Sequence, residues 1–469
     1  MKEFGPDLYQ EAMLPAPRFL LRRLGGVQIF VLSFLVLIAI GTTGFLVLPG
    51  LYTGEEMGFV DALFTATSAV CVTGLIVVDT ATYFTPFGQA WVLALIQAGG
   101  LGILTFTTLI FAALGRRSSL SLEEAVGGHS AILKNVESRH LVATIVAVTL
   151  ALEAAGGVVL WLLWQDEMGW TGAFWPAVFH AVSAFCNAGF SVFTDSLVGF
   201  RTEEATLLVV GVLVILGGLG FIVVEDLRAR YVKRTARRLS VHTRLVLAAT
   251  AALLLVGWLL FAVFEWRHQL ADLTLTERLA NAAYMSVTPR TAGFNTVDYA
   301  EVTNPSLFLT ILLMLVGGSP GSTAGGFKTV TFALLVLLLF ARLRGDRQVH
   351  VFSRSIPLET LNRSIGLVIG GLTVLGSSVF FLMVSEAQVG GFGDRIDFVR
   401  FVFEAHSAFG TVGLSMGATP ELSTAGRLMV TFLMFVGRVG PAAVVAAMFR
   451  ARRQHHPRFR YGEEDVILG

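Results

Sequence analysis

Eight long apolar segments run through this chain, and each is long enough to cross the hydrocarbon core of a bilayer. They cover residues 26–48, 87–113, 141–164, 206–227, 245–265, 306–341, 364–385 and 426–449. A transmembrane helix needs about 20 consecutive apolar residues. Only 14% of the 469 residues are charged, against about 25% in soluble domains. The sequence therefore predicts an all-α integral membrane protein with eight full spans.

The distribution of basic residues predicts how the spans are oriented. Of the 34 Lys and Arg residues, 25 lie in residues 1–25, 115–140, 228–244, 342–363 and 450–469. By the positive-inside rule these segments and both termini are cytoplasmic. The first span is too long for a signal-peptide core, so it is expected to be retained. The basic stretch 228–238 is accordingly interpreted as a cytoplasmic loop and not as a nucleic-acid site.

Four shorter, semi-apolar segments lie between the spans, at 59–70, 174–185, 276–287 and 397–409. Segments of this length do not cross the hydrocarbon core, so they are expected to be re-entrant half-helices. Each is followed by a short glycine-containing strip with the sequence CVTGL, CNAGF, RTAGF or GTVGL. A non-helical strip at membrane depth is tolerated only where it is buried in protein or lines a water-filled cavity.

Two glycine markers recur in step along the chain. The strip glycines, spaced by 115, 104 and 120 residues, are Gly74, Gly189, Gly293 and Gly413. A second marker (GGLG, GGLG, GGSPG and GRVG) follows after 25, 28, 24 and 24 residues, starting at Gly99, Gly217, Gly317 and Gly437. The pattern predicts four copies of span, pore half-helix and span around a central pore, with eight full spans and four half-helices.

A serine lies six residues before three of the strip glycines, at Ser68, Ser183 and Ser407. In the third copy Ser286 lies seven residues before, so we expect one extra residue near Pro289 and Arg290. The predicted organisation is a tail (1–25), four repeats (26–114, 141–227, 245–341 and 364–450), three loops (115–140, 228–244 and 342–363) and a second tail (451–469). Parallel repeats of this kind imply an axis along the membrane normal, on which the strips converge.

Four converging strips suit a cation pathway. Glycine allows the backbone angles that turn successive carbonyl groups to one side, and a ring of carbonyl oxygens can replace the hydration shell of a monovalent cation. The alternative is that the glycines only allow helices to pack closely, but four strips in register favour the ring.

The plan resembles the Trk/Ktr/HKT superfamily of potassium transporters, most closely the membrane subunit of the bacterial Ktr system (KtrB-like). The four strips and the stretch GGSPGSTAGGFKT carry this resemblance, which covers nearly the whole chain. It implies a selectivity filter that binds K+ at backbone carbonyls of Thr73, Gly74, Ala188, Gly189, Ala292, Gly293, Val412 and Gly413. With one glycine per strip the filter is simpler than that of tetrameric potassium channels.

The stretch GGSPGSTAGGFKT interrupts the span 306–341, and glycine and proline are expected to break the helix there. We interpret it as an intramembrane gate across the pathway, as the resemblance also implies. Its residues are Gly317, Gly318, Ser319, Pro320, Gly321, Ser322, Thr323, Ala324, Gly325, Gly326 and Lys328. A kinked helix is the alternative. A nucleotide-binding P-loop is excluded, because that motif needs glycine directly before lysine and Phe327 intervenes.

Arg438 lies in the fourth marker, at the middle of a span. A charge at that depth is costly and indicates a function. We expect Arg438 to face the pore beside the gate and to bind loop carbonyls, the alternative being an ion pair with a carboxylate such as Glu153. Two interpretations of Arg290 stay open, a bond to strip carbonyls or exposure to the outer vestibule. Lys328 is expected either at the gate or extended toward the cytoplasmic surface.

The sequence predicts no catalytic residues, so we expect a transporter and not an enzyme. The transported ion would be K+, taken up across the bacterial cytoplasmic (inner) membrane. Cys71 and Cys186 provide neither a disulfide framework nor a multi-cysteine metal site. The resemblance implies a homodimer and a ring of cytosolic RCK-type nucleotide-binding regulatory subunits. The sequence of this chain contains no nucleotide-binding pattern and no cofactor site, so any response to a nucleotide is expected to reside in those subunits. Sodium activation, and channel-like conduction as against symport, stay open, and an ion-coupled transporter of another small solute is the alternative function.

Overall fold

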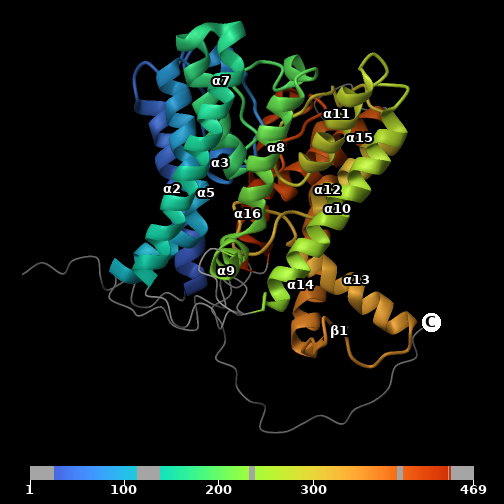
Figure 1. The fold of residues 1–469 in the computed structure, drawn as a ribbon. Helices are drawn as coiled ribbons and strands as arrows, with labels where there is room; N and C mark the ends of the chain where they lie inside the picture. The colour runs from blue at the N-terminus through green and yellow to red at the C-terminus, as the bar shows by residue number, and fades with distance from the viewer. Residues whose placement is uncertain (1–25, 114–137, 232–237, 388–394, 442, 445–469) are drawn as a thin grey trace, which may run out of the picture.

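A computed structural model describes residues 26–113, 138–231, 238–387, 395–441 and 443–444 of the chain. The predicted tails 1–25 and 451–469, and most of the loop 115–140, lie outside the described residues. The described chain is predominantly helical, as the sequence predicts, and it contains several apolar helices (Figure 1).

The first half of the chain forms α2 (Gly26–Val47), α3 (Phe59–Val70), α4 (Thr80–Tyr83), α5 (Pro86–Ala113), α7 (Ser138–Cys186), α8 (Glu204–Leu219) and α9 (Phe221–Tyr231). The second half forms α10 (Val241–Glu265), α11 (Leu275–Val287), α12 (Asn304–Leu315), α13 (Thr329–Leu343), α14 (Leu358–Ala387), α15 (Arg395–Gly410) and α16 (Thr424–Val439). Two 3-10 turns, Val198–Phe200 and Thr419–Glu421, and a small hairpin of β1 (His350–Val351) and β2 (Arg354–Ser355) complete the described elements.

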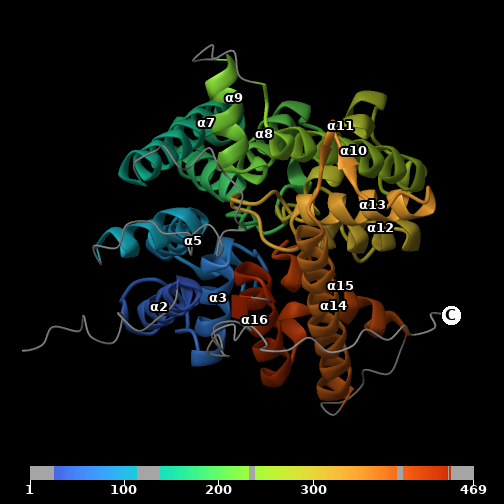
Figure 2. The ribbon, with the colours of Figure 1, turned by 90° about the horizontal axis from the view of Figure 1, so that it is seen from below.

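Within the described residues, four stretches are long and apolar enough to cross a membrane: α2, most of α7, α10 and α14. Each begins one of the predicted repeats. In α7 the predicted span and half-helix follow each other across Gly169, whose backbone (φ 72°, ψ 161°) is not helical. The other predicted half-helices are α3, α11 and α15. Seen from below, the helices follow one another in chain order around a central region (Figure 2).

Two predicted spans are shorter than expected. The span 206–227 is broken at Gly220, where α8 and α9 meet at a bend of 96°, and the helix of the span 426–449 ends at Val439, before Gly440. Gly220 and Gly440 share one conformation, with φ of 85° and 93° and ψ of 141° and 136°. This left-handed, extended backbone is open to glycine and incompatible with helix. The predicted break in the span 306–341 is present, between α12 and α13.

Buried carboxylates join the ends of paired spans in the second half of the chain. Glu265 accepts hydrogen bonds from the backbone N–H and the hydroxyl of Thr303, the N-cap of α12, at 2.9 and 2.7 Å. Glu386 binds Ser423, the N-cap of α16, in the same way, at 3.0 and 2.7 Å. The two spans of each pair are thereby held at a fixed separation around the half-helix between them.

Glu386→Ala is expected to lower the free energy of unfolding by about 2 kcal/mol, because the N–H of Ser423 loses its buried acceptor. Thermal unfolding in detergent, followed by tryptophan fluorescence, measures the change. Glu359→Ala is the matched control, since Glu359 lies on the same helix and makes an exposed pair with Arg363, which contributes little to stability. Equal destabilisation by both substitutions would contradict this account of α14 and α16.

Candidate cation pathway

The four glycine strips share one backbone conformation. Each strip glycine has positive φ, and so does the residue two positions before it. The glycines are Gly74 (92°), Gly189 (71°), Gly293 (82°) and Gly413 (94°), and the preceding residues are Val72 (56°), Asn187 (61°), Thr291 (72°) and Thr411 (50°). Positive φ is strained for residues other than glycine. Its recurrence in all four strips indicates that one chain geometry is built four times.

The strips meet in a closed ring. A Cβ atom added to Gly74 would collide with the carbonyl oxygen of Ala188 and lie 3.0 Å from the Cα of Gly189. The same relation holds from each strip to the next. A Cβ on Gly189 would lie 2.9 Å from the Ala292 oxygen, one on Gly293 would collide with the Val412 oxygen, and one on Gly413 would collide with the Thr73 oxygen. Each strip glycine therefore lies directly against the neighbouring strip, where no side chain fits.

All eight residues predicted for the filter lie in this ring, although they come from segments more than 330 residues apart. The carbonyl oxygens that abut the neighbouring glycines belong to the residue just before each glycine: Thr73, Ala188, Ala292 and Val412. An arrangement of this kind brings backbone oxygens together and excludes side chains, which suits a cation without its water shell.

Hydroxyl groups lock the strips from behind. The Ser68 hydroxyl donates to the carbonyl of Leu75 at 2.7 Å, and the Gly74 N–H donates to the same hydroxyl at 3.1 Å. Ser183 donates to the Phe190 carbonyl at 2.8 Å, and Ser407 accepts from the Gly413 N–H at 3.0 Å.

The third strip corrects the sequence alignment. Thr288 takes the locking position there, with its hydroxyl donating to the carbonyl of Phe294 at 2.5 Å. Ser286, the residue expected from the sequence, instead donates to Leu254 at 2.7 Å. Counted from the locking hydroxyl, the third turn is one residue shorter than the others and not longer. Threonine carries the same kind of hydroxyl as serine, so a pattern defined by serine alone does not identify Thr288.

The second glycine markers lie against the ends of the half-helices. A Cβ atom on Gly99, Gly217 or Gly437 would collide with the carbonyl oxygen of Val70, Phe185 or Phe409 respectively. These carbonyls belong to the last turns of the half-helices, where the helix dipole is negative. Close packing is therefore the role of these marker glycines in the structure.

The residues between α12 and α13 form a closed loop with a narrow neck. At the neck, Val316 and Phe327 pair as a parallel bridge, Gly317 N–H donates to the Phe327 carbonyl at 2.9 Å, and Thr329 N–H donates to Gly318 at 3.0 Å. Inside the loop, the Ser322 hydroxyl donates to the carbonyl of Ser319 at 2.7 Å. The segment is therefore a closed loop and not a kinked helix.

The loop is anchored to the glycine markers of two other repeats. Ser319 N–H donates to Gly218 at 3.0 Å and Thr323 N–H donates to Gly217 at 3.3 Å. Gly326 N–H donates to the Gly437 carbonyl at 3.3 Å. The helix break at Gly220 leaves the carbonyl of Leu219 without a helical partner, and the Ser319 hydroxyl of the loop donates to it.

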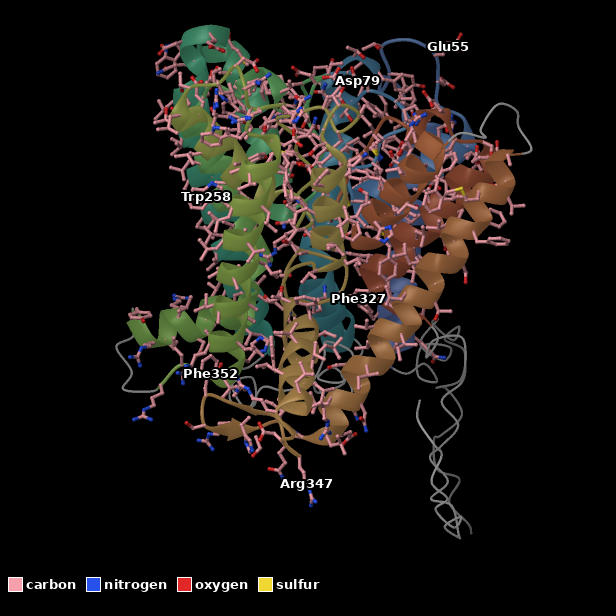
Figure 3. All side chains as sticks on the ribbon, turned by 90° about the vertical axis from the view of Figure 1, so that its right-hand side faces the viewer. Glu55, Asp79, Trp258, Phe327, Arg347 and Phe352 are labelled. Atoms are coloured by element: carbon pink, nitrogen blue, oxygen red, sulfur yellow. The ribbon has the colours of Figure 1, made fainter. Side chains whose placement is uncertain are left out.

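The loop also lies against the glycine strips. A Cβ atom on Gly325 would collide with the hydroxyl oxygen of Thr411, and one on Gly317 would lie 3.3 Å from the Thr291 side chain. The Thr323 hydroxyl donates to the carbonyl of Phe185 at 3.2 Å. Loop and ring are therefore in direct contact, and Phe327 lies between the two ends of the molecule (Figure 3).

Arg438 contacts the loop. Its guanidinium donates to the carbonyl of Thr323 and, at 2.9 Å, to the carbonyl of Gly99. Within the described part of the chain no carboxylate contacts Arg438. Glu153, the alternative partner, instead accepts from the amide of Gln97 at 3.0 Å and from the thiol of Cys186 at 3.7 Å.

Two further basic residues bind loop carbonyls. Lys328 donates to the Ala324 carbonyl at 2.7 Å and so is directed into the loop. Arg290 fits neither open interpretation. It is 8% exposed, and its guanidinium lies 3.4 Å from both the Gly317 carbonyl and the Thr329 hydroxyl, at the loop neck. No sequence pattern indicates this contact, because residues 290 and 317 are brought together only by the fold.

Comparisons with known proteins show the family to which the chain belongs. The family model described as a cation transport protein, TrkH, matches residues 26–452. The chain is 38% identical to the potassium/sodium uptake protein NtpJ of Enterococcus hirae, covering 96% of this chain and 98% of the relative. It is 37% identical to the Ktr system potassium uptake protein B of Vibrio alginolyticus, covering 95% of each.

A solved structure has the same fold. The crystal structure of the potassium transporter TrkH from Vibrio parahaemolyticus matches with a TM-score of 0.70 and 19% identity, over 94% of this chain and 86% of that one. The family is one of transporters and not of enzymes. The chain is therefore a multi-pass membrane protein that belongs to the TrkH family of cation transport proteins.

Proposed function

We propose that this protein takes up potassium ions through the ring of glycine strips. The observation that carries the proposal is the closed contact of Gly74, Gly189, Gly293 and Gly413, each against the carbonyl that precedes the next. The names of the relatives support potassium as the ion. The membrane potential would drive uptake, at about 2.3 kcal/mol per charge for each 100 mV.

In this proposal the chain consists of four repeats of span, pore half-helix and span, with the boundaries expected from the sequence. The second spans of the last three repeats bend or end at Gly220, at the loop and at Gly440. The filter is formed by the backbone of the ring residues, which are Thr73, Gly74, Ala188, Gly189, Ala292, Gly293, Val412 and Gly413. The common φ pattern of the strips and their locking hydroxyls support this assignment.

The loop from Gly317 to Gly326, with Lys328 and Arg438, would be the gate. Its contacts with the strips place it beside the ring, and three basic side chains bind its carbonyls. A fixed positive charge beside the pathway raises the barrier to a cation. Opening would require the loop to leave Arg438 and the markers at Gly217 and Gly437.

We also propose the surroundings expected from the sequence: the bacterial cytoplasmic membrane, both termini cytoplasmic, a homodimer, and RCK-type regulatory subunits. Sodium would influence transport as an activator. The charge distribution supports the orientation, because Glu55 and Asp79 lie at one end of the molecule and Arg347 at the other (Figure 3). The exposed arginines at that basic end, Arg342, Arg344 and Arg347, offer a docking face for an acidic partner surface.

Uptake of rubidium-86, a potassium analogue, into proteoliposomes that contain the chain tests the proposed function. With the interior negative, we expect uptake that external potassium blocks at a concentration at least about tenfold lower than sodium does. A labelled sugar or amino acid should not enter. Equal block by the two cations, or entry of the organic solute, would contradict potassium uptake through a selective filter.

A further inference from the structure

One position on the half-helices is occupied by a different polar residue in each repeat. It lies nine residues before the strip glycine and three before the locking serine. Its occupants are Thr65, His180, Tyr284 and Glu404, all buried. Two of the four, His180 and Glu404, form hydrogen bonds with residues that follow the strip glycine, here called the exit segment.

In the second repeat this residue is His180, which is fully buried. Its Nδ1 lies 2.8 Å from the carbonyl oxygen of Pro176. Because a carbonyl only accepts, Nδ1 carries the proton, and Nε2 of the neutral ring accepts from the Ser191 hydroxyl at 2.9 Å. Ser191 is two residues after Gly189, and its oxygen accepts the N–H of Phe193 at 2.9 Å. The imidazole therefore fixes the exit segment of the second strip.

In the fourth repeat Glu404, also fully buried, does the same with a carboxylate. It accepts hydrogen bonds from the Ser415 hydroxyl, from the N–H groups of Met416 and Ala418 at 3.1 and 3.3 Å, and from the Thr419 hydroxyl at 2.8 Å. Ser415 is two residues after Gly413, as Ser191 is after Gly189. A buried carboxylate with four donors is fully satisfied and holds its partners rigidly.

The first and third repeats lack this contact. In the described residues the Thr65 and Tyr284 hydroxyls are buried without a hydrogen-bond partner. Counting from the locking Thr288 gives Met285 in place of Tyr284, and its side chain is apolar. The residues two after the glycines are Ile76 and Asn295, and the Asn295 amide donates to its own segment at Val297.

Around the ring the contacts run from Gly74 to Gly189, to Gly293, to Gly413 and back, so the second and fourth strips face each other. We propose that His180 and Glu404 are positioning residues for ion selection. They hold two opposite strips of the filter rigid, while the first and third strips have, among the described residues, no hydrogen-bonding side chain at this half-helix position that reaches the exit segment. A rigid pair sets the distance across the ring, and this distance decides how well a carbonyl cage fits potassium over sodium. The inference rests on the proposed function and deepens it.

The test compares block of rubidium-86 uptake by potassium and by sodium in single variants. Ser191→Ala and Ser415→Ala remove one bond from each contact with little change in volume. His180→Gln and Glu404→Gln replace the half-helix partner in each contact. We expect the ratio of the half-blocking sodium and potassium concentrations to fall about five- to tenfold in each, as loss of one buried hydrogen bond allows.

Thr65→Val is the matched control, because it changes the same position in the first repeat and removes a hydroxyl without a partner among the described residues. It should keep the wild-type ratio. The double variants His180→Gln/Ser191→Ala and Glu404→Gln/Ser415→Ala should be no less selective than the worse single variant, because each pair acts as one contact.

Wild-type selectivity in Ser191→Ala and Ser415→Ala at normal uptake rates would overturn the inference, and so would an equal loss in Thr65→Val. The two serine substitutions are mild and are read independently, so they decide the inference even where His180→Gln or Glu404→Gln fails to fold. A wild-type chain without potassium preference would overturn the proposed function itself and the inference with it. Preference that survives in every variant would overturn only the role of His180 and Glu404.

Discussion

Replacing Gly74 by serine is expected to lower the preference for potassium over sodium by about tenfold or more. The backbone at Gly74 has φ of 92°, where a residue with a side chain is strained by about 1–3 kcal/mol. The added Cβ would also collide with the Ala188 carbonyl oxygen of the next strip. Both effects displace carbonyls of the ring. Rubidium-86 uptake with sodium or potassium as competitor measures the change.

Gly58→Ser is the control for this prediction. Gly58 precedes the same half-helix, has an ordinary φ of −68° and offers open space to a Cβ atom. Serine is also favourable at a helix N-cap. Unaltered selectivity in Gly74→Ser, or an equal loss of selectivity in Gly58→Ser, would contradict the proposal that the ring is the selectivity filter.

Shortening the loop by deletion of residues 319–325 is expected to raise uptake by the chain alone by about tenfold or more. The deletion removes the anchors at Gly217 and Gly218 and the carbonyl that binds Arg438. A cation would then no longer meet the loop backbone in its path. Arg438→Gln should raise uptake less, since the loop keeps its other anchors. The initial rate of rubidium-86 uptake without any partner protein measures both.

Arg427→Gln is the matched control for Arg438→Gln, on the same helix and with the same change. Arg427 pairs with Asp61 at 2.6 Å at the other end of the span and does not contact the loop. Uptake should stay at the wild-type rate there. A shortened loop that leaves uptake unaltered, in a chain that still folds, would exclude the loop as the gate.

Part of the fold could be predicted from the sequence because the backbone angles of a non-helical strip or loop require glycine, and the strip and loop glycines recur at regular spacing. The strip at Gly189 and the loop at Gly317 are marked in this way, and both lie where the pattern indicates. Gly220 and Gly440 were missed, because a single glycine at the end of GGLG or GRVG looks the same whether the helix continues or turns. The first GGLG, at Gly99, does lie inside a helix.

The individual contacts behind the glycine strips could not be predicted for a different reason. Thr288 replaces the expected serine because any hydroxyl at that place can lock the strip, and Arg290 reaches Gly317 only once the third repeat has closed on itself. His180 and Glu404 share a position but not a chemistry, so alignment by residue type does not relate them. Contacts between distant segments depend on backbone geometry that spacing alone does not give.

The location of a bound ion tests the central claim most directly. An experimental structure of the protein in rubidium, with the anomalous signal recorded, should show an ion on the axis of the ring, between Thr73, Ala188, Ala292 and Val412. Exchange into sodium should weaken that peak. A chain that takes up rubidium but binds it away from Gly74, Gly189, Gly293 and Gly413 would contradict the account.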